Sequence, residues 1–415
     1  MTSNDQPPVR GALSNLRVLD LSRVLAGPWC TQNLADLGAE VIKVERPGVG
    51  DDTRGWGPPW LKDGEGADTP DSTYYAAANR GKRSITVDIA KPAGRDVILE
   101  LAREADIFVE NYKVGDLKRY GLDYASVSAV NPRIIYCSIT GFGQTGPESH
   151  KPGYDFIFQG MGGVMSVTGE RDDRPGGGPQ KVGIAVTDIL TGMYSTVAIL
   201  AAVNHRHVTG QGQYIDMALL DCIVAFGANQ ASYYLNSGKV PGRLGNAHAS
   251  VAPYDVYATS DGHLIIAVGN DQQWQRCCTA LGRPDLAADE RFLRGPSRLA
   301  NREALVAEVQ ASLRARSTAE WTAHLEELDV PCGPINNYQQ VFENAQVRHR
   351  GQRFALPRSD GGTVQLVGSP MALAATPPRC ELPPPRLGEH TDAILREMLG
   401  RDDAQIAALR AAKVV

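Results

Sequence analysis

The sequence predicts an α/β protein with a Rossmann-like open parallel sheet in a large domain and a smaller α+β domain. The first observation is a strand-like run, Arg17–Leu21, followed by a helical stretch that Pro28 opens and Gly38 closes. A second strand, Glu40–Glu45, completes a βαβ unit, which implies parallel strands and a right-handed crossover. The second observation is that this alternation continues through the first half of the chain. The third is a change of pattern near Ser237.

The remaining elements of the large domain follow in order. A strand is expected at Ser84–Asp88, and the next helix carries apolar residues at helical spacing: Val97, Ile98, Leu101, Ala102 and Ala105. Further strands are expected at Ile107–Val109, Ile134–Ser138 and Gln213–Met217. Helices are expected from Asp188 to about Asn204 and over Leu219–Leu235, after a loop region rich in glycine and proline at Gly141–Gly178.

The smaller domain begins with a predicted hairpin, Asp255–Ala258 and His263–Val268. Helices are expected at Gln272–Leu281, Arg302–Arg314 and Thr318–Leu328, and near the C-terminus at Thr391–Leu399 and Ala404–Ala412. We therefore expect a large α/β domain in residues 1–225, a small α+β domain in 226–333 and a C-terminal return to the large domain in 334–415.

Composition excludes several classes of protein. The chain has 415 residues and a net charge of −5, so no overall positive field attracts nucleic acid. Its seven cysteines are scattered without C-x-x-C spacing, which indicates buried thiols in a reducing compartment. No secretory signal is expected, because the N-terminal residues lack an apolar core. No stretch approaches the ~20 apolar residues that cross a bilayer, and the longest candidate is Val197–Val203. A cytoplasmic protein without a membrane partner is expected.

Common cofactor and metal motifs are missing. The turn after the first strand, Ser22–Gly27, lacks G-x-G-x-x-G, so a dinucleotide would find no glycine cradle there. No Walker A loop, H-E-x-x-H or G-x-S-x-G occurs. His205 and His207 lie on different sides of a helix, so no metal site is expected. A small basic cluster is expected in a solvated loop and comprises Arg80, Lys82 and Arg83.

One carboxylate, Asp188, stands at the mouth of the long apolar helix. Free backbone N–H groups and the helix dipole would stabilise it there as an anion. An ionised carboxylate beside a pocket can act as a nucleophile. The alternative is an ordinary helix N-cap, which is the role of most aspartates at such positions.

Several segments in order along the chain resemble the class III CoA-transferase family (CaiB/BaiF type), which includes formyl-CoA transferase and the α-methylacyl-CoA racemases. These segments are Val18–Leu21 with Gly27-Pro28, Ala39–Arg46 with Gly50–Arg54, Asn79–Ser84, Val109–Tyr112, Ser138–Gly143, Gly153–Asp155, Thr187-Asp188 and Pro253-Tyr254. Within the family, Trp56–Pro59 and Pro334–Asn337 look most like the succinate–hydroxymethylglutarate (glutarate) CoA-transferase branch.

The resemblance implies an interlocked homodimer of ring-like subunits, each with the two domains predicted above. It also implies that Asp188 is the catalytic nucleophile. Coenzyme A and acyl-CoA would enter as substrates, with no permanently bound cofactor and no metal. The family motifs carry CoA contacts over to Val24, Leu25, Ala26, Arg46, Val87, Asp88, Ile89, Ala90, Asn111, Tyr112, Lys113, Arg119, Tyr154 and Asp155. Arg46 and Arg119 are expected on the phosphates or the adenine, because they follow strand ends.

An aspartate suits CoA transfer because one thioester is exchanged for another at almost no cost in free energy. An aspartyl anhydride is no more stable than a thioester and does not trap the acyl group, as a serine ester would. We expect Asp188 to attack the donor acyl-CoA, form the anhydride, and then become an aspartyl–CoA thioester that an acceptor carboxylate attacks. Water must be excluded, and the glycines near Gly162-Gly163 and Gly242–Gly245 are candidate lids.

Two other functions compete with CoA transfer: a 2-methylacyl-CoA racemase, and a CoA-binding protein without activity. A racemase needs acid–base groups on both faces of the α-carbon, and its branch has a histidine where this chain has Tyr154. A phenol of pKa about 10 is a poor base near neutral pH, so transfer is favoured. A dicarboxylate acceptor such as glutarate is expected, with candidate contacts at Arg54, Trp56, Arg243 and His248, each of which has a purely structural alternative.

Overall fold

The computed structural model describes residues 11–415, which form two compact units. The large unit comprises residues 11–164, 182–232 and 346–415, and the small unit comprises 165–181 and 233–345. Residues 165–181 and 334–345 were expected in the large domain, and their contacts place them in the small unit instead. Residues 226–232 were expected in the small domain and belong to the large unit.

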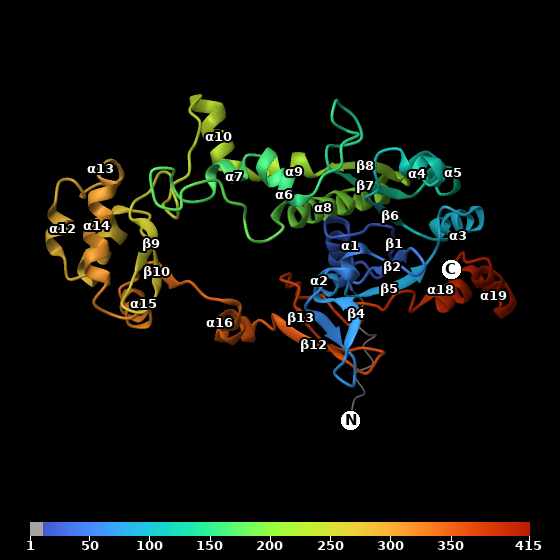
Figure 1. Cartoon of the computed structure of the whole chain (residues 1–415). Coiled ribbons are helices and arrows are strands. Elements are labelled where there is room, and N and C mark those ends of the chain that lie inside the picture. Colours follow the sequence, from blue (N-terminus) through green and yellow to red (C-terminus); the bar gives the residue numbers. More distant parts are fainter. Residues whose placement is uncertain (1–10) are drawn as a thin grey trace. The chain divides into compact units, whose positions relative to one another are not determined.

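The centre of the large unit is a six-stranded, wholly parallel sheet with the order β5-β2-β1-β6-β7-β8 (Figure 1). Its strands are β1 (Arg17–Asp20), β2 (Glu40–Glu45), β5 (Lys82–Thr86), β6 (Ile107–Glu110), β7 (Ile135–Thr140) and β8 (Gln213–Ala218). This is the doubly wound order, in which the connections change direction between β1 and β6. The expected open parallel sheet is confirmed.

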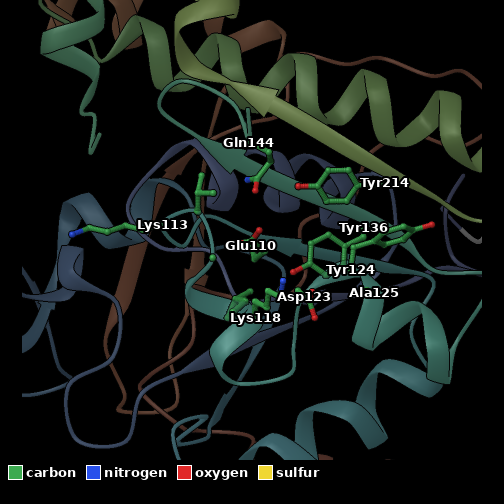
Figure 2. Close-up of a pocket in the computed structure, with 12 residues that line it drawn as sticks. Glu110, Lys113, Lys118, Asp123, Tyr124, Ala125, Tyr136, Gln144 and Tyr214 are labelled. Carbon is green, nitrogen blue, oxygen red and sulfur yellow. The ribbon is translucent and has the colours of Figure 1, made fainter. Parts of the chain in front are cut away.

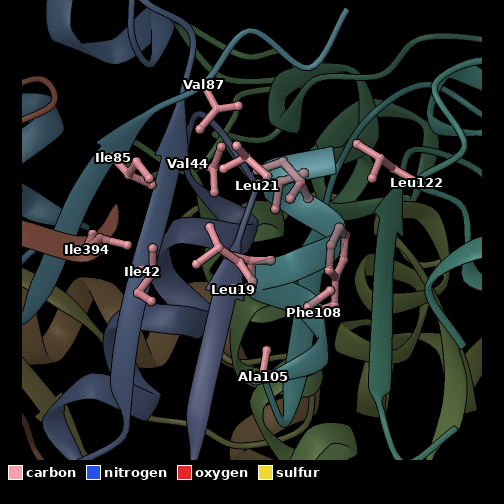
Figure 3. Close-up of a cluster of buried hydrophobic side chains, with 14 of the residues drawn as sticks. Leu19, Leu21, Ile42, Val44, Ile85, Val87, Ala105, Phe108, Leu122 and Ile394 are labelled. Atoms are coloured by element: carbon pink, nitrogen blue, oxygen red, sulfur yellow. The ribbon is translucent and has the colours of Figure 1, made fainter. Parts of the chain in front are cut away.

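Each central strand is apolar on both faces because both faces are covered by helices. Successive residues such as Val18 and Leu19, or Ile107 and Phe108, point to opposite faces and belong to two different core clusters. One cluster contains Leu19, Ile42 and Phe108 (Figure 3) and packs on α3, α5, α18 and α19. The other packs on α1, α6, α8 and α9. The helices of this unit are α1 (Ala26–Asp36), the 3₁₀ turn η1 (Asp52–Gly55), α2 (Thr73–Ala77), α3 (Pro92–Arg103), α4 (Asp116–Arg119), α5 (Tyr124–Val130), α6 (Asp155–Met161), α8 (Val186–Thr209), α9 (Leu219–Phe226), α18 (Thr391–Leu399) and α19 (Asp403–Ala411).

Two antiparallel hairpins, which the sequence did not reveal, complete the large unit. They are β3–β4 (Trp60–Lys62 and Asp68–Ser72) and β12–β13 (Arg353–Pro357 and Thr363–Val367). Leu61, Ala76, Val364 and Leu366 bury a small apolar cluster between them.

The small unit combines a three-stranded antiparallel sheet, β11-β10-β9, with helices around its own apolar core. The predicted hairpin is confirmed as β9 (Tyr254–Ala258) and β10 (His263–Ala267), and β11 is Cys332–Pro334. The helices are α11 (Asp271–Ala280), α12 (Pro284–Ala288), α13 (Gly295–Ala300), α14 (Arg302–Leu313), α15 (Thr318–Glu327) and α16 (Tyr338–Glu343). Three short helices cross the unit boundaries: α7 (Val164–Val167), α10 (Ala228–Ser237) and α17 (Ala345–His349).

Two expectations from the sequence are corrected by burial. Arg80 and Lys82 do not lie in a solvated loop: Arg80 pairs with Asp36 at 2.6 Å, and Lys82 pairs with Asp20 at 3.1 Å, both beneath the surface. Acidic partners distant in the sequence fold around these cations, because a buried charge needs a partner.

Helix α8 is the second correction. By length and composition it is apolar enough to cross a membrane, although no such stretch was expected. Its buried residues, among them Ile199, Ala202 and Val203, pack in the core beside α1. All seven cysteines are free thiols and five of them are buried, as expected.

Candidate active site

A cleft lies at the carboxyl ends of the neighbouring parallel strands β1 and β6, where the connections of the sheet change direction. In open α/β sheets the divergent loops at this point leave room for a ligand. We call it the nucleophile cleft; among the residues that line it are Arg23, Val24, Leu25, Ala26, Asn111, Tyr112, Lys113, Gly141, Tyr154 and Asp188. Eight of the sequence-predicted site residues therefore meet in one place.

A second hollow, the strand-end groove, follows the ends of β2 and β5. Among its lining residues are Arg46, Val87, Asp88, Ile89, Ala90, Tyr112 and Tyr120. It shares Arg23, Asp52, Tyr112 and Asp116 with the nucleophile cleft, so the two hollows adjoin. The Arg46 guanidinium is exposed and forms no ion pair with any residue in 11–415, which leaves it open to an anionic ligand.

Arg119 is the predicted CoA contact that lines neither hollow. Its side chain is 67% exposed, pairs with Asp116 at 2.8 Å and lies over the ring of Tyr120. Asp116 and Tyr120 both line the strand-end groove, so Arg119 contacts residues of the groove without lining it itself.

Asp188 is the third residue of α8, and Ala185 is the N-cap, so Asp188 is not the cap. Its carboxyl group accepts no hydrogen bond within the described part of the chain, and it lines the nucleophile cleft. Burial and the neighbouring Asp155 raise the pKa of Asp188 to about 7. The expectation that the helix terminus holds this group strongly ionised is therefore wrong.

Asp155, at the start of α6, takes the helix-terminal donor instead. It accepts the backbone N–H of Thr187 at 2.8 Å and the Gln159 amide at 2.7 Å. A carboxylate at this position satisfies an orphan N–H of α8 and places a like charge near Asp188. Asp155 was expected to contact CoA, yet it does not line the cleft, and its visible partners are Thr187 and Gln159.

The turn that forms one wall of the cleft has an unusual backbone. Val24 has φ +70°, a left-handed conformation that is costly for a β-branched residue, of order 1–3 kcal/mol. Side chains hold the turn on both sides. Asn111 accepts the Arg23 N–H at 2.9 Å and donates to the Arg23 carbonyl at 2.7 Å, while Asp51 accepts the Val24 N–H at 3.2 Å.

Tyr74 is a site residue that the sequence did not reveal. It lies in α2, and burial together with Asp188, Asp155 and Asp51 raises the pKa of its phenol to about 12. The phenol therefore stays protonated at neutral pH, and it lies close enough to Asp188 to be affected by the charge of that carboxylate. Trp56 packs edge-on against Tyr74 with 5.2 Å between ring centroids and is 44% exposed, but it lines neither the nucleophile cleft nor the strand-end groove.

Three predicted substrate contacts are engaged elsewhere. Arg54 is buried, pairs with Glu45 at 2.7 Å and Asp71 at 2.6 Å, and lies over the ring of Tyr75. We therefore remove it from the substrate contacts and assign it a structural role.

Arg243 and His248 belong to the small unit. Arg243 pairs with Asp172, and the His248 ring lies 5.0 Å from that of Tyr254. Neither lines the nucleophile cleft.

A third hollow, the tyrosine pocket, lies beyond Lys113 at the ends of β6 and β7. Figure 2 shows the rings of Tyr124, Tyr136 and Tyr214 gathered near Glu110, with Lys113 pointing away from them. Burial raises the pKa of Glu110 to about 7, while the Tyr112 N–H and Ser138 stabilise its anion. Sequence reasoning missed this acid, since Glu110 stands in an ordinary apolar strand.

Comparison with known proteins identifies the family. The model of CoA-transferase family III matches residues 13–391. The chain belongs to this family. The enzyme is 48% identical to the succinate–glutarate CoA-transferase of Agrobacterium fabrum over 95% of this chain and 97% of that protein. It is 43% identical to the succinyl-CoA:glutarate CoA-transferase of Mus musculus over 97% of this chain and 90% of that protein.

The fold of this CoA-transferase is also known from a crystal structure. A CaiB/BaiF family protein from Brucella suis superposes with a TM-score of 0.84 at 47% identity, over 94% of this chain and 100% of that one. The predicted family and enzyme class are confirmed, and CoA thioesters are its substrates.

Proposed function

We propose that this enzyme moves CoA from succinyl-CoA to a second dicarboxylate, of which glutarate is the best candidate. The observation that carries the proposal is the unbonded carboxyl group of Asp188 in a cleft lined by the family's CoA-contact positions. The relatives with 48% and 43% identity, both named for succinate and glutarate, support this pair of acids.

In the proposed mechanism, the Asp188 carboxylate attacks the thioester carbonyl of the donor. The C–S bond breaks, giving a mixed anhydride on Asp188 and CoA thiolate. The thiolate then attacks the Asp188 carbonyl, releases the donor acid and leaves an aspartyl–CoA thioester. The acceptor carboxylate attacks that thioester, and the released thiolate takes the acceptor acyl group from the new anhydride, regenerating Asp188.

The surroundings of Asp188 suit both of its roles in this cycle. With a pKa of about 7, the carboxyl is a better nucleophile than an unperturbed aspartate, and more than half of it is ionised just above neutral pH. Because no hydrogen bond within residues 11–415 holds it, it can approach a thioester without first breaking one. Tyr74 would donate to the oxygen on which charge develops.

CoA would span the two adjoining hollows. We assign the acyl and pantetheine end to the nucleophile cleft, where Tyr154 is 64% exposed, and the charged end to the strand-end groove. The unpaired Arg46 is the proposed phosphate contact, since guanidinium binds phosphate in two-pronged fashion. Trp56 is retained as a candidate contact of the acid through its packing against Tyr74.

We also propose the interlocked homodimer and a cytoplasmic location. A set of apolar side chains on α6, α8 and α9 of the large unit is exposed, and a large exposed apolar patch is typical of an interaction surface. This apolar face comprises Phe156, Ile157, Met161, Met193, Tyr194, Val197, Val224 and Phe226. A second copy of the chain would cover it, and the free thiols suit a reducing compartment.

The test is a panel of acyl-CoA donors and free dicarboxylates, read by mass for new CoA esters. We expect succinyl-CoA and glutarate to give glutaryl-CoA, with no racemisation of a 2-methylacyl-CoA. Hydroxylamine added during turnover should tag Asp188, and Asp188→Asn should keep CoA binding and lose exchange by at least about a thousandfold. Exchange by the Asp188→Asn enzyme, or a tag on another residue, would overturn the proposal.

A further inference from the structure

In many nucleotide-binding sheets, glycines form the turn after the first strand. In this enzyme the corresponding turn, which is one wall of the nucleophile cleft, is held in place by side chains. The turn between β1 and α1 contains Val24 in the left-handed backbone region, a conformation that a β-branched side chain disfavours. Such an outlier persists only when surrounding contacts enforce it, and outliers of this kind cluster at functional sites.

Asp51 is the group that enforces it. Both of its carboxylate oxygens accept the Val24 N–H, at 3.2 and 3.3 Å. Lys43 donates to the same carboxylate at 2.9 Å and, with the same ammonium group, to the carbonyl of Ser22 at 2.9 Å. Lys43 and Asp51 are wholly buried, so this pair fixes the residues on both sides of the turn in a rigid setting.

The turn leads directly into the first turn of α1, which borders the candidate nucleophile. Leu25 and Ala26 line the same cleft as Asp188. Helices α1 and α8 touch where a Cβ on Gly192 would lie 2.7 Å from the Ala26 carbonyl oxygen, one turn beyond Asp188. A shift of the turn therefore moves the wall that faces Asp188.

We propose that Asp51 is a positioning residue for CoA transfer: held by Lys43, it fixes the left-handed Val24 and so places the first turn of α1 against Asp188. The inference rests on the proposed function. Asp51 borders the strand-end groove, but its side chain is wholly buried and its carboxylate is engaged by Val24, Lys43 and Thr53. In the proposed mechanism it contacts none of the reacting atoms. It acts through the Val24 backbone alone. This route can be tested with a residue at position 24 that adopts the same backbone conformation without the Asp51 carboxylate.

The experiment is a double-mutant cycle of Asp51→Asn and Val24→Gly, assayed for CoA exchange at saturating succinyl-CoA and glutarate. Glycine adopts φ +70° without help, so the loss caused by Asp51→Asn should be large with Val24 and small with Gly at position 24. We expect kcat to fall at least about tenfold in the Val24 background and at most about threefold in the Gly background, with KM for succinyl-CoA nearly constant. Equal losses in the two backgrounds would overturn the proposal.

Thr53→Val is the matched control. The Thr53 hydroxyl donates to the same carboxylate at 2.8 Å but does not touch Val24, so kcat should stay near that of the parent enzyme. If Asp51→Asn alone does not fold, the proposal is tested by comparing kcat of Val24→Gly with kcat of the double variant. A tenfold lower kcat in the double variant contradicts the proposal. Asp188→Asn, assayed in parallel, tests the nucleophile separately. The Asp51 cycle compares rates only among variants that retain Asp188, so the two hypotheses can fail independently.

Discussion

At the scale of single residues, the charge on Asp188 is set by what surrounds it rather than by the helix it begins. Burial and the Asp155 carboxylate both disfavour the anion, and no donor within residues 11–415 offsets them. Asp188 therefore exchanges its proton close to neutral pH, where an unperturbed aspartate is fully ionised. Both activity and stability should depend on pH for this reason.

We expect the rate of CoA exchange to rise with pH through about 7, because only ionised Asp188 attacks the donor. Asp155→Asn removes the like charge, lowers the pKa of Asp188, and should move this rise to lower pH. The pH profile of kcat/KM for succinyl-CoA measures the shift. Asp221→Asn, an exposed change on α9, is the control, and an identical profile for Asp155→Asn would contradict the role given to its charge.

The same shift predicts that the native carboxyl costs stability. An acid whose pKa rises on folding stabilises the fold only at low pH, and that contribution is lost as pH rises from about 4 through about 7. A pKa raised from 3.8 to about 7 corresponds to about 4 kcal/mol at pH 8 as an upper bound. Asp188→Asn should therefore be more stable than the parent at pH 8, and the difference should shrink at pH 5.

Urea unfolding at the two pH values measures this effect. An Asp188→Asn enzyme that is less stable than the parent at pH 8 would show that Asp188 has a stabilising partner, contrary to the structure.

Tyr74→Phe should lower kcat by about tenfold to a hundredfold, because it removes the phenol near Asp188 to which the proposed mechanism gives the role of donor. The ring remains, so its contact with Trp56 and the binding of CoA should be preserved. Steady-state kinetics with succinyl-CoA, together with a CoA-binding measurement, separates the two effects. Unchanged kcat would remove Tyr74 from the mechanism.

Sequence motifs predicted the cleft residues that follow strand ends, because the end of a strand fixes where its next residues lie. They did not predict Tyr74, which comes near Asp188 from a short helix after a hairpin. Arg54 was assigned to substrate because nothing in the sequence shows that Glu45 and Asp71 fold around it. Whether a charge is paired or free depends on the tertiary structure.

At the scale of elements, the site depends on how closely α1 and α8 approach. Gly192 allows the contact, because a Cβ there would lie 2.7 Å from the Ala26 carbonyl and 3.1 Å from the Trp29 side chain. A backbone carbonyl cannot move aside as a flexible side chain can, so the helices would have to separate.

Gly192→Ala should therefore destabilise the enzyme by roughly 1–3 kcal/mol, although alanine is the better helix former by about 1 kcal/mol. Denaturant unfolding measures the change. Ala201→Gly, at an exposed position of the same helix, is the control. It should lower the free energy of unfolding by about 1 kcal/mol, because glycine is the poorer helix former. A stabilised Gly192→Ala enzyme would show that the two helices tolerate a wider spacing.

The central strands β1, β6 and β7 were predictable because strands buried on both faces read as nearly continuous apolar runs. The hairpins β3–β4 and β12–β13 were missed because they are short and bury only a few side chains each. The helix expected at Leu219–Leu235 is interrupted, since α9 ends at Phe226 with Gly227 as its C-cap. Glycine at that position was visible in the sequence but does not by itself end a helix.

At the scale of the whole molecule, the large unit is built from the two ends of the described chain. The Asp88 N–H donates to the Val414 carbonyl at 2.7 Å, Thr391 accepts the Thr86 N–H at 3.1 Å, and Arg401 pairs with Glu100 at 2.6 Å. In Figure 1 α18 and α19 accordingly lie beside β5 and α3. Only the family resemblance predicted this return, because contacts between residues some three hundred positions apart leave no local pattern in the sequence.

The proposed interlocked dimer has a measurable signature. Two populations of the enzyme with different affinity tags, mixed at micromolar concentration, should form no mixed dimers over a day, because threaded subunits separate only by unfolding. Mixed dimers should form after joint denaturation and refolding. Rapid exchange of subunits without denaturant would indicate a dimer that is not interlocked. A monomer in sedimentation would contradict the proposal that a second copy of the chain covers the apolar face.

The composition of α8 has a consequence for biosynthesis. Until α1 and the sheet have closed over it, this segment of 24 residues is indistinguishable by length and polarity from a bilayer anchor. A shortened polypeptide that retains Val186–Thr209 but lacks α1 would expose that surface to chaperones and lipid. Expression trials should therefore keep the segments of the large unit on one polypeptide.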